Sequence, residues 1–185
     1  MILPIYIYGM SVLRKEAEDV TENIEELKPL LDDMFATLDQ SGGIGLAAPQ
    51  IGRAERVVVI DLDALKEDMP EYEGYRHAFI NGYILEESEE TNTSDEGCLS
   101  LPGISEKVER PAEIRATWID ENGVKHDEWV KGYLARVIQH EFDHLDGVMF
   151  IDHLKPLRKQ MIKNKLKSLL QGKVRADYRY KVARR

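Results

Sequence analysis

Two histidines stand four residues apart in the segment from His140 to His144, which reads His-Glu-Phe-Asp-His. On a helix this spacing places both imidazoles on one face, one turn apart, so that they can bind a single cation. Glu141 projects about 100° around the helix from His140 and can reach a water on that cation without binding the cation itself. The segment predicts a metal site with an acid–base residue beside it. Chance spacing of two of the five histidines is the alternative interpretation.

The third ligand distinguishes between enzyme classes that share this helix motif, because a catalytic metal usually has three protein ligands and a water. No glutamate follows Glu141, which excludes the peptidases that take a downstream glutamate as ligand. The longer His-x-x-Gly-x-x-His extension also fails, since its last position is Phe150. Asp152 and His153 remain candidates, but Cys98 is a stronger one because a thiolate binds metals well. A buried structural cysteine is the competing interpretation.

Three helices and several strands would position these residues. Apolar residues recur at helical spacing in two segments, which predicts helices over residues 23–40 and 132–145. We expect a last helix over residues 156–171. Glycines end the first two, at Gly42 and Gly147. β-Branched and aromatic residues predict strands over residues 57–60, 78–85, 114–120 and 124–130.

The order of these elements predicts the fold class. Asn122-Gly123 lies between the last two predicted strands, a strong signal for a hairpin. Strands that follow one another with few helices between them are typical of an α+β fold. We therefore expect antiparallel β-sheets packed around a central helix that carries the histidine motif, with an N-terminal and a C-terminal helix. The polar residues 63–76 should form a surface loop.

Composition and charge limit the function classes. The 185 residues have the length of one domain, and their apolar runs are too short to cross a membrane. The N-terminus lacks the basic region and cleavage site of a signal peptide, so we expect a cytoplasmic, bacterial-type protein. The net charge is −9, yet residues 155–185 hold twelve of the 25 basic residues and only one of the 34 acidic ones. This basic helix or tail either binds nucleic acid or an acidic surface, or is a solvated helix face.

Three segments together are similar to one known family. They are Gly-Ile-Gly-Leu-Ala-Ala-Pro-Gln over residues 43–50, Glu-Gly-Cys-Leu-Ser over residues 96–100, and Gln-His-Glu-Phe-Asp-His over residues 139–144. Their order and separations resemble those of peptide deformylases, and the resemblance spans almost the whole chain as a single catalytic domain over residues 1–185. It implies an enzyme that removes the N-formyl group from the N-terminal formyl-methionine of nascent polypeptides and releases formate.

The resemblance also implies a role for each site residue. The metal would lower the pKa of its bound water, so that hydroxide attacks the formyl carbon, and Glu141 would move the proton to the departing nitrogen. The side-chain amide of Gln50 and the backbone N–H of Leu99 would stabilise the negative oxygen that develops. The three implied metal ligands are Cys98, His140 and His144.

The peptide substrate is expected to run beside the metal. The resemblance implies that residues 43–50 are extended there and that Ile44, Gly45 and Gly97 contact the peptide, because glycines allow close backbone approach. Helix geometry brings Tyr133 and Val137 to the side of His140, where they would form an apolar pocket for methionine. Arg136 would line the entrance or be solvated.

The metal, the partners and two competing functions complete the predictions. Two imidazoles and a thiolate suit zinc, whereas the resemblance implies ferrous iron, with nickel, cobalt or zinc also able to bind. The expected partners are formyl-methionyl nascent peptides and, through residues 155–185, the ribosome, with no membrane and no sequence-specific nucleic acid. The competing functions are a zinc peptidase that cleaves internal bonds and a ribosome- or RNA-binding protein without catalysis.

Overall fold

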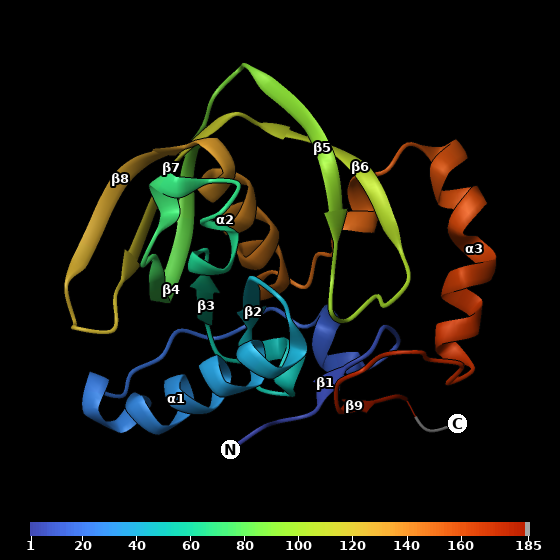
Figure 1. Ribbon diagram of the computed structural model, residues 1–185, viewed down its shortest axis with the longest axis horizontal. Helices are drawn as coiled ribbons and strands as arrows, with labels where there is room; N and C mark the ends of the chain where they lie inside the picture. The colour runs from blue at the N-terminus through green and yellow to red at the C-terminus, as the bar shows by residue number, and fades with distance from the viewer. Residues whose placement is uncertain (184–185) are drawn as a thin grey trace.

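The computed structural model describes residues 1–183 and has the predicted α+β fold with antiparallel sheets (Figure 1). The α-helices in that range are α1 (Ile24–Ser41), α2 (Gly132–Leu145) and α3 (Pro156–Leu170). The strands in the same range are β1 (Ile5–Tyr6), β2 (Gly45–Ala47), β3 (Val57–Asp61), β4 (Arg76–Glu87), β5 (Thr91–Gly97), β6 (Ser105–Pro111), β7 (Glu113–Ile119), β8 (Lys125–Lys131) and β9 (Tyr180–Lys181). No helix among these residues is long and apolar enough to span a membrane.

A five-stranded antiparallel sheet in the order β2-β3-β4-β7-β8 separates two apolar clusters. Successive side chains of a strand point to opposite faces. Val57 and Val59 of β3 therefore join the cluster that contains α1, while Val58 and Ile60 join the cluster that contains α2. Because both faces of β3 are covered, its sequence is a continuous apolar run rather than an alternating one.

Local sequence signals fix the ends of the helices. The side chain of Asn23 accepts a hydrogen bond from the Glu26 N–H at 3.1 Å, which caps the N-terminus of α1. Gly42 follows the last residue of α1 with a φ of 71°, a left-handed conformation that glycine adopts without strain. The predicted helices over residues 23–40, 132–145 and 156–171 match α1, α2 and α3 closely.

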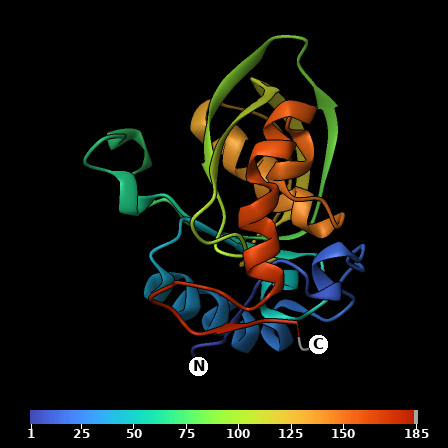
Figure 2. The same cartoon turned by 90° about the vertical axis from the view of Figure 1, so that its right-hand side faces the viewer.

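The predicted loop over residues 63–76 is mostly exposed and projects from the body of the molecule (Figure 2). It contains two short 3₁₀ turns, at Asp63–Leu65 and Pro70–Tyr72. The hydroxyl of Tyr72 accepts a hydrogen bond from the Leu134 N–H at 3.1 Å, in the first turn of α2. The loop thus caps the helix that carries the histidine motif.

The β5–β6 hairpin was not expected from the sequence. In β6 exposed and buried residues alternate, and the buried positions are Glu106, Val108 and Arg110. Two of these three inward side chains are charged, so the strand lacks the alternating apolar pattern that reveals a half-buried strand. Strand β5 ends at Gly97, directly before Cys98, and in Figure 1 it runs from the top of the molecule down beside β6.

The C-terminal segment returns to the N-terminus after α3. β9 pairs with β1 in parallel, and the Ile5 N–H donates to the carbonyl of Arg179 at 2.9 Å. The Ile7 N–H donates to the carbonyl of Lys181, also at 2.9 Å. Figure 2 shows the red C-terminal segment running below α3 to reach this pairing. The two ends of the described chain are thereby joined.

Candidate metal centre

Three side chains with metal-binding atoms meet at one point. Cys98, His140 and His144 each offer one such atom, and these atoms lie within 4.8 Å of one another. Both histidines come from α2, with ring centroids 5.4 Å apart, and Cys98 directly follows β5. The thiol Sγ lies 3.3 Å from Nε2 of His144. The two other candidates from the sequence, Asp152 and His153, are not in this group.

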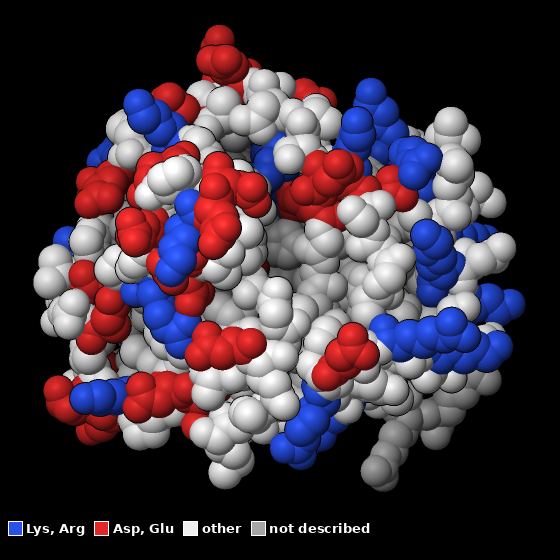
Figure 3. Space-filling model, viewed as in Figure 1, with Lys and Arg blue, Asp and Glu red and all other residues white. Residues whose placement is uncertain are grey.

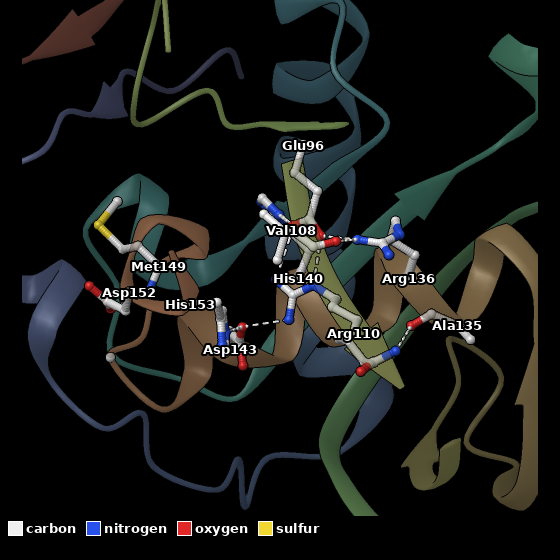
Figure 4. Close-up of polar contacts among 12 residues, drawn as sticks. Glu96, Val108, Arg110, Ala135, Arg136, His140, Asp143, Met149, Asp152 and His153 are labelled. Atoms are coloured by element: carbon white, nitrogen blue, oxygen red, sulfur yellow. Dashed lines mark hydrogen bonds and ion pairs between the residues drawn. The ribbon is translucent and has the colours of Figure 1, made fainter. Parts of the chain in front are cut away.

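A buried carboxylate orients one of the two histidines. Oε1 of Glu96 lies 2.8 Å from Nδ1 of His140, which leaves Nε2 of the ring for a metal. Glu96 also accepts hydrogen bonds from Arg110 at 2.7 and 3.0 Å and from Arg136 at 2.5 Å. Figure 4 shows Glu96 between these partners. Burial raises the pKa of Glu96, but the larger combined effect of His140 and Arg110 lowers it to about 2. Glu96 is therefore ionised at neutral pH.

The ion-pair network extends away from the metal ligands. Arg110 also donates to Asp143 at 2.9 Å, and Asp143 lies 2.7 Å from Nε2 of His153 (Figure 4). Arg136 donates as well to the carbonyl of Asn92 on β5 at 3.0 Å. These bonds join α2 to the β5–β6 hairpin, so the element that precedes the cysteine is fixed to the helix that carries the histidines.

The charge state of the donors suits a divalent metal. Burial raises the pKa of Cys98, but the neighbouring His144 and His140 lower it more, to about 5, which favours the thiolate. A thiolate and two imidazoles are a common ligand set for zinc and for other first-row transition metals. Oε2 of the buried Glu141 has no hydrogen-bond partner among residues 1–183. An unpartnered buried carboxylate oxygen beside three donors is consistent with a metal and its water at this position.

Glycine at position 45 makes room for the Glu141 side chain. A Cβ atom built on Gly45 would lie 2.4 Å from Oε1 of Glu141. Burial is the largest influence on the pKa of Glu141 and raises it above the usual range of a glutamate. A carboxyl with a raised pKa is better able to accept a proton and give it back near neutral pH.

The amide of Gln50 is held in one orientation. Its Oε1 accepts the Ala47 N–H at 2.9 Å, and its Nε2 donates to the hydroxyl of Ser100 at 3.2 Å and lies 3.4 Å from Sγ of Cys98. Gln50 is 1% exposed, so its side chain lies inside the protein. A donor with a fixed direction is what stabilisation of a developing oxyanion requires.

A cavity of about 350 Å³ brings the predicted site residues together. All of the predicted substrate-contacting residues line it, as do the predicted catalytic residues and two of the three predicted ligands; His144 lies buried behind it. The predicted residues on the wall are Ile44, Gly45, Gln50, Gly97, Cys98, Leu99, Tyr133, Val137, His140 and Glu141. Arg136 also lines the cavity but is buried and ion-paired, so it is not a solvated residue.

Sequence reasoning missed two parts of this site. Glu96 belongs to a segment that the sequence analysis used, and its hydrogen bond to His140 could have been expected, because metal-binding histidines usually donate their second N–H to a carboxylate or carbonyl. Tyr178 lies on the cavity wall, where it bonds to Leu99, although it is far along the chain. No local sequence signal marks Tyr178, because its position depends on the pairing of β9 with β1.

Sequence comparisons relate this chain to a known family of enzymes. The sequence model of the polypeptide deformylase family matches residues 2–160. A peptide deformylase of Salinibacter ruber is 45% identical, over 96% of this chain and 93% of that protein. A peptide deformylase of Flavobacterium psychrophilum is 41% identical, over 98% of this chain and 97% of that protein.

Comparison with solved structures also finds peptide deformylases. A peptide deformylase of Plasmodium falciparum has a TM-score of 0.83 at 39% identity, covering 91% of this chain and 95% of that chain. A peptide deformylase of Thermotoga maritima has a TM-score of 0.76 at 40% identity, covering 84% of this chain and 99% of that chain.

A helix with two metal-binding histidines, a nearby thiolate and a buried carboxylate together define a metal-dependent hydrolase centre. The chain belongs to the polypeptide deformylase family. It is therefore an enzyme, and the resemblance seen in the sequence is confirmed.

Proposed function

We propose that the protein hydrolyses the N-formyl group of formyl-methionyl nascent peptides and releases formate. The observation that carries the proposal is that three metal-binding side chains meet beside one cavity, which Cys98 and His140 line directly. A buried carboxylate oxygen without a hydrogen-bond partner among residues 1–183 and an oriented amide belong to residues on the same cavity wall. A divalent metal held by Cys98, His140 and His144 would make water nucleophilic at neutral pH and polarise the formyl oxygen. The remaining steps fall to residues of the chain.

Glu141 is the proton carrier in this proposal. Its Oε2, which has no hydrogen-bond partner in the described part of the chain, accepts a proton from the attacking water. It then delivers the proton to the nitrogen as the carbon–nitrogen bond breaks. The products are formate and a free amine. The raised pKa of Glu141, caused mainly by burial, supports both halves of this transfer.

Gln50 and Leu99 stabilise the oxygen that becomes negative during the attack. Nε2 of Gln50 is directed toward Cys98 by the bond that its Oε1 accepts from Ala47. The backbone N–H of Leu99, directly after Cys98, is the second donor. Removal of one such donor typically costs about 2.7–4 kcal/mol of transition-state stabilisation.

The peptide binds as an added strand along β2. Within residues 1–183, β2 is at the edge of the five-stranded sheet and pairs with β3 alone. An edge strand with free backbone groups can pair with an extended peptide. Ile44 and Gly45 then contact the backbone of the peptide, and Tyr133 and Val137 face the methionine side chain from α2.

The decisive experiment measures formate released from a formyl-methionyl dipeptide by the metal-loaded protein. Glu141→Gln keeps the shape of the side chain and removes its basic oxygen, so we expect kcat to fall by about 10²–10⁴-fold with bound metal unchanged. Glu113→Gln, an exposed carboxylate on β7, is the matched control and should behave like the wild type. Equal rates for the wild type and Glu141→Gln would contradict the proposed role.

The zinc-peptidase alternative is tested in the same assay. An unformylated peptide of the same sequence is offered to the metal-loaded protein, and we expect no cleavage of its internal bonds. Cleavage of this peptide would favour the peptidase function. Formate release from the formylated peptide, with no cleavage of internal bonds in either peptide, would exclude it.

We propose ferrous iron as the metal of the working enzyme. An Fe(II) ion beside a thiolate is sensitive to oxygen, because both the metal and Cys98 can be oxidised. Protein prepared without oxygen should therefore keep its activity longer than an aerated sample. Equal lifetimes under the two conditions would weigh against iron.

We also propose that the basic residues of α3 bind the ribosome, the source of nascent chains in the cytoplasm. Exposed lysines lie along α3, among them Lys163 and Lys167, and Figure 3 shows basic side chains gathered on that side of the molecule. Attraction to RNA phosphates predicts binding that weakens as salt rises.

Charge reversal tests this docking better than deletion, because the segment after α3 contacts β1. The variant Lys163→Glu with Lys167→Glu should co-sediment less with ribosomes than the wild type. The control, Lys28→Glu with Lys125→Glu, makes the same charge change at exposed positions on α1 and β8. Equal loss in both variants, or no loss in either, would refute a specific role for α3.

A further inference from the structure

The C-terminal segment contributes one residue to the reaction cavity. Tyr178 lines the cavity next to Leu99, and its hydroxyl donates a hydrogen bond to the carbonyl oxygen of Leu99 at 2.7 Å. The family model matches residues 2–160, so this tyrosine lies beyond the part of the chain that the family model covers. Its role has to be inferred from its own contacts.

The hydrogen bond of the tyrosine completes a set that fixes the backbone after the cysteine ligand. The carbonyl of Cys98 accepts the Leu101 N–H at 2.9 Å, and the carbonyl of Ser100 accepts the Tyr8 N–H, also at 2.9 Å. The carbonyl of Leu99 lies between these two and accepts its bond from the tyrosine hydroxyl. The carbonyls of Cys98, Leu99 and Ser100 are thereby all hydrogen-bonded. Only the bond to Leu99 comes from a side chain, so a substitution of Tyr178 can remove it.

The tyrosine itself is held firmly and stays protonated. Arg179, the next residue, accepts the Ile5 N–H at 2.9 Å through its carbonyl, where β9 begins its pairing with β1. Burial raises the pKa of Tyr178 to about 12, and the nearby Cys98 adds to the effect. The hydroxyl is therefore a hydrogen-bond donor throughout the pH range in which an enzyme of this kind is assayed.

We propose that Tyr178 is a positioning residue for the hydrolytic reaction. Its hydroxyl holds the peptide group that follows Leu99, while the Leu101 N–H holds the preceding peptide group through the Cys98 carbonyl. With both groups held, rotation of the backbone at Leu99 is restricted, so that the Leu99 N–H stays directed at the oxygen that becomes negative in the transition state. The inference rests on the proposed function, in which that N–H is an oxyanion donor. It assigns the C-terminal segment a role in catalysis that is separate from any ribosome binding by α3.

The expected effect is specific to the chemical step. One neutral hydrogen bond alters an equilibrium between orientations by about two- to tenfold. The oxyanion exists only in the transition state, so a misaligned donor lowers kcat and leaves substrate binding almost unchanged. A tyrosine that merely formed the cavity wall would instead change KM, and most strongly for peptides long enough to reach it.

The test compares Tyr178→Phe with Tyr180→Phe in the metal-loaded enzyme. The first variant keeps the ring and removes the hydroxyl. The second makes the same change two residues later, where the exposed hydroxyl lies 3.5 Å from the carbonyl of Val174 and does not line the cavity. Formate release from a formyl-methionyl dipeptide and from a formylated tetrapeptide gives kcat and KM for each. Bound metal and thermal unfolding temperature are measured for every variant.

We expect Tyr178→Phe to lower kcat about fivefold on both substrates with KM unchanged within twofold, and Tyr180→Phe to match the wild type. An unchanged kcat in Tyr178→Phe would overturn the inference, as would a loss confined to KM of the longer peptide. An equal fall in kcat for both variants would also overturn it, since the effect would then come from the segment as a whole.

Failure of the inference is distinguishable from failure of the proposed function. If the wild type releases formate, Glu141→Gln does not, and Tyr178→Phe equals the wild type, the proposed function stands and the positioning role falls. If the wild type releases no formate from either peptide, the proposed function fails first, and the positioning role fails with it.

Discussion

At the scale of single residues, the metal site depends on the side chains that hold the ligands as well as on the ligands themselves. Glu96 accepts hydrogen bonds from Arg110 and Arg136 and bonds to Nδ1 of His140. The carboxylate therefore fixes the ring of a metal ligand and neutralises two buried guanidinium groups. Such an outer partner commonly changes metal affinity by 10–100-fold when it is removed.

We predict that Glu96→Gln weakens metal binding by about 10–100-fold. The amide cannot neutralise the buried arginines, so the free energy of unfolding should also fall, by about 3 kcal/mol. Competition with a chelator measures the affinity, and denaturant unfolding of the metal-free protein measures the stability. A variant that kept both wild-type values would show that Glu96 does not orient His140.

A second prediction at the residue scale concerns Gly45. The Cβ of Gly45→Ala would lie 2.4 Å from Oε1 of Glu141, and a flexible side chain moves more easily than the backbone. Displacing a catalytic group by about 1 Å can cost about 10²-fold in rate, so kcat should fall by about that factor. The thermal unfolding temperature should hardly change. Full activity in this variant would mean that Glu141 works from another position.

At the scale of elements, the β7–β8 hairpin illustrates how local signals fix a turn. Gly123 has a φ of 78° and donates its N–H to the carbonyl of Asp120 at 3.0 Å. His126 on β8 stacks on Trp118 of β7, with ring centroids 4.8 Å apart, and bonds to Asp120 at 2.7 Å and Glu128 at 3.1 Å. The hairpin therefore contains a titratable ion pair between β8 and Asp120, the residue that follows β7.

This pair predicts a pH-dependent contribution to stability. The hydrogen bond to Asp120 is the main cause of the raised pKa of His126. A group whose pKa is raised in the folded state stabilises that state fully below its unfolded pKa, about 6.5. The stabilisation is lost as the pH rises through the higher folded-state pKa. The difference in unfolding free energy between the wild type and His126→Gln should thus be larger at pH 5.5 than at pH 9. A difference independent of pH would contradict the assignment.

At the scale of the whole molecule, the two ends of the described chain stabilise each other and the cavity. Ile5 and Ile7 donate backbone hydrogen bonds to the segment around β9, and Tyr178 of that segment packs against the core. The contact joins residues from opposite ends of the chain to the loop after Cys98. The C-terminal segment is therefore packed against the core of the enzyme and does not merely extend from α3.

Removal of residues 172–185 should therefore destabilise the protein and impair catalysis. Loss of two backbone hydrogen bonds and of the packed Tyr178 predicts a fall of at least about 2 kcal/mol in the free energy of unfolding. The fall in kcat should be at least as large as that of Tyr178→Phe. Denaturant unfolding and formate release measure the two effects, and a truncated protein with wild-type stability would show that the β1–β9 pairing contributes little.

The sequence alone determined the elements whose causes are local. Helix α1 begins at the Asn23 cap and ends before Gly42, and α2 ends shortly before Gly147. The β7–β8 hairpin follows from Asn122-Gly123. The pairing of His140 with His144 is likewise local, because one helical turn brings them together. The resemblance in three short segments then supplied Cys98, Gln50 and the family. That the chain forms a single domain remains a prediction.

Contacts between residues far apart in the chain became visible only in the folded protein. Cys98 lies 46 residues from His144, and it reaches the histidines because the β5–β6 hairpin, whose inward residues are largely charged, is fastened to α2 through Glu96 and its arginines. Apolar periodicity cannot reveal a strand that buries ion pairs. Tyr178 reaches Leu99 only after β9 has paired with β1. Such contacts form when the whole chain packs, so the residues nearby in sequence carry no signal for them.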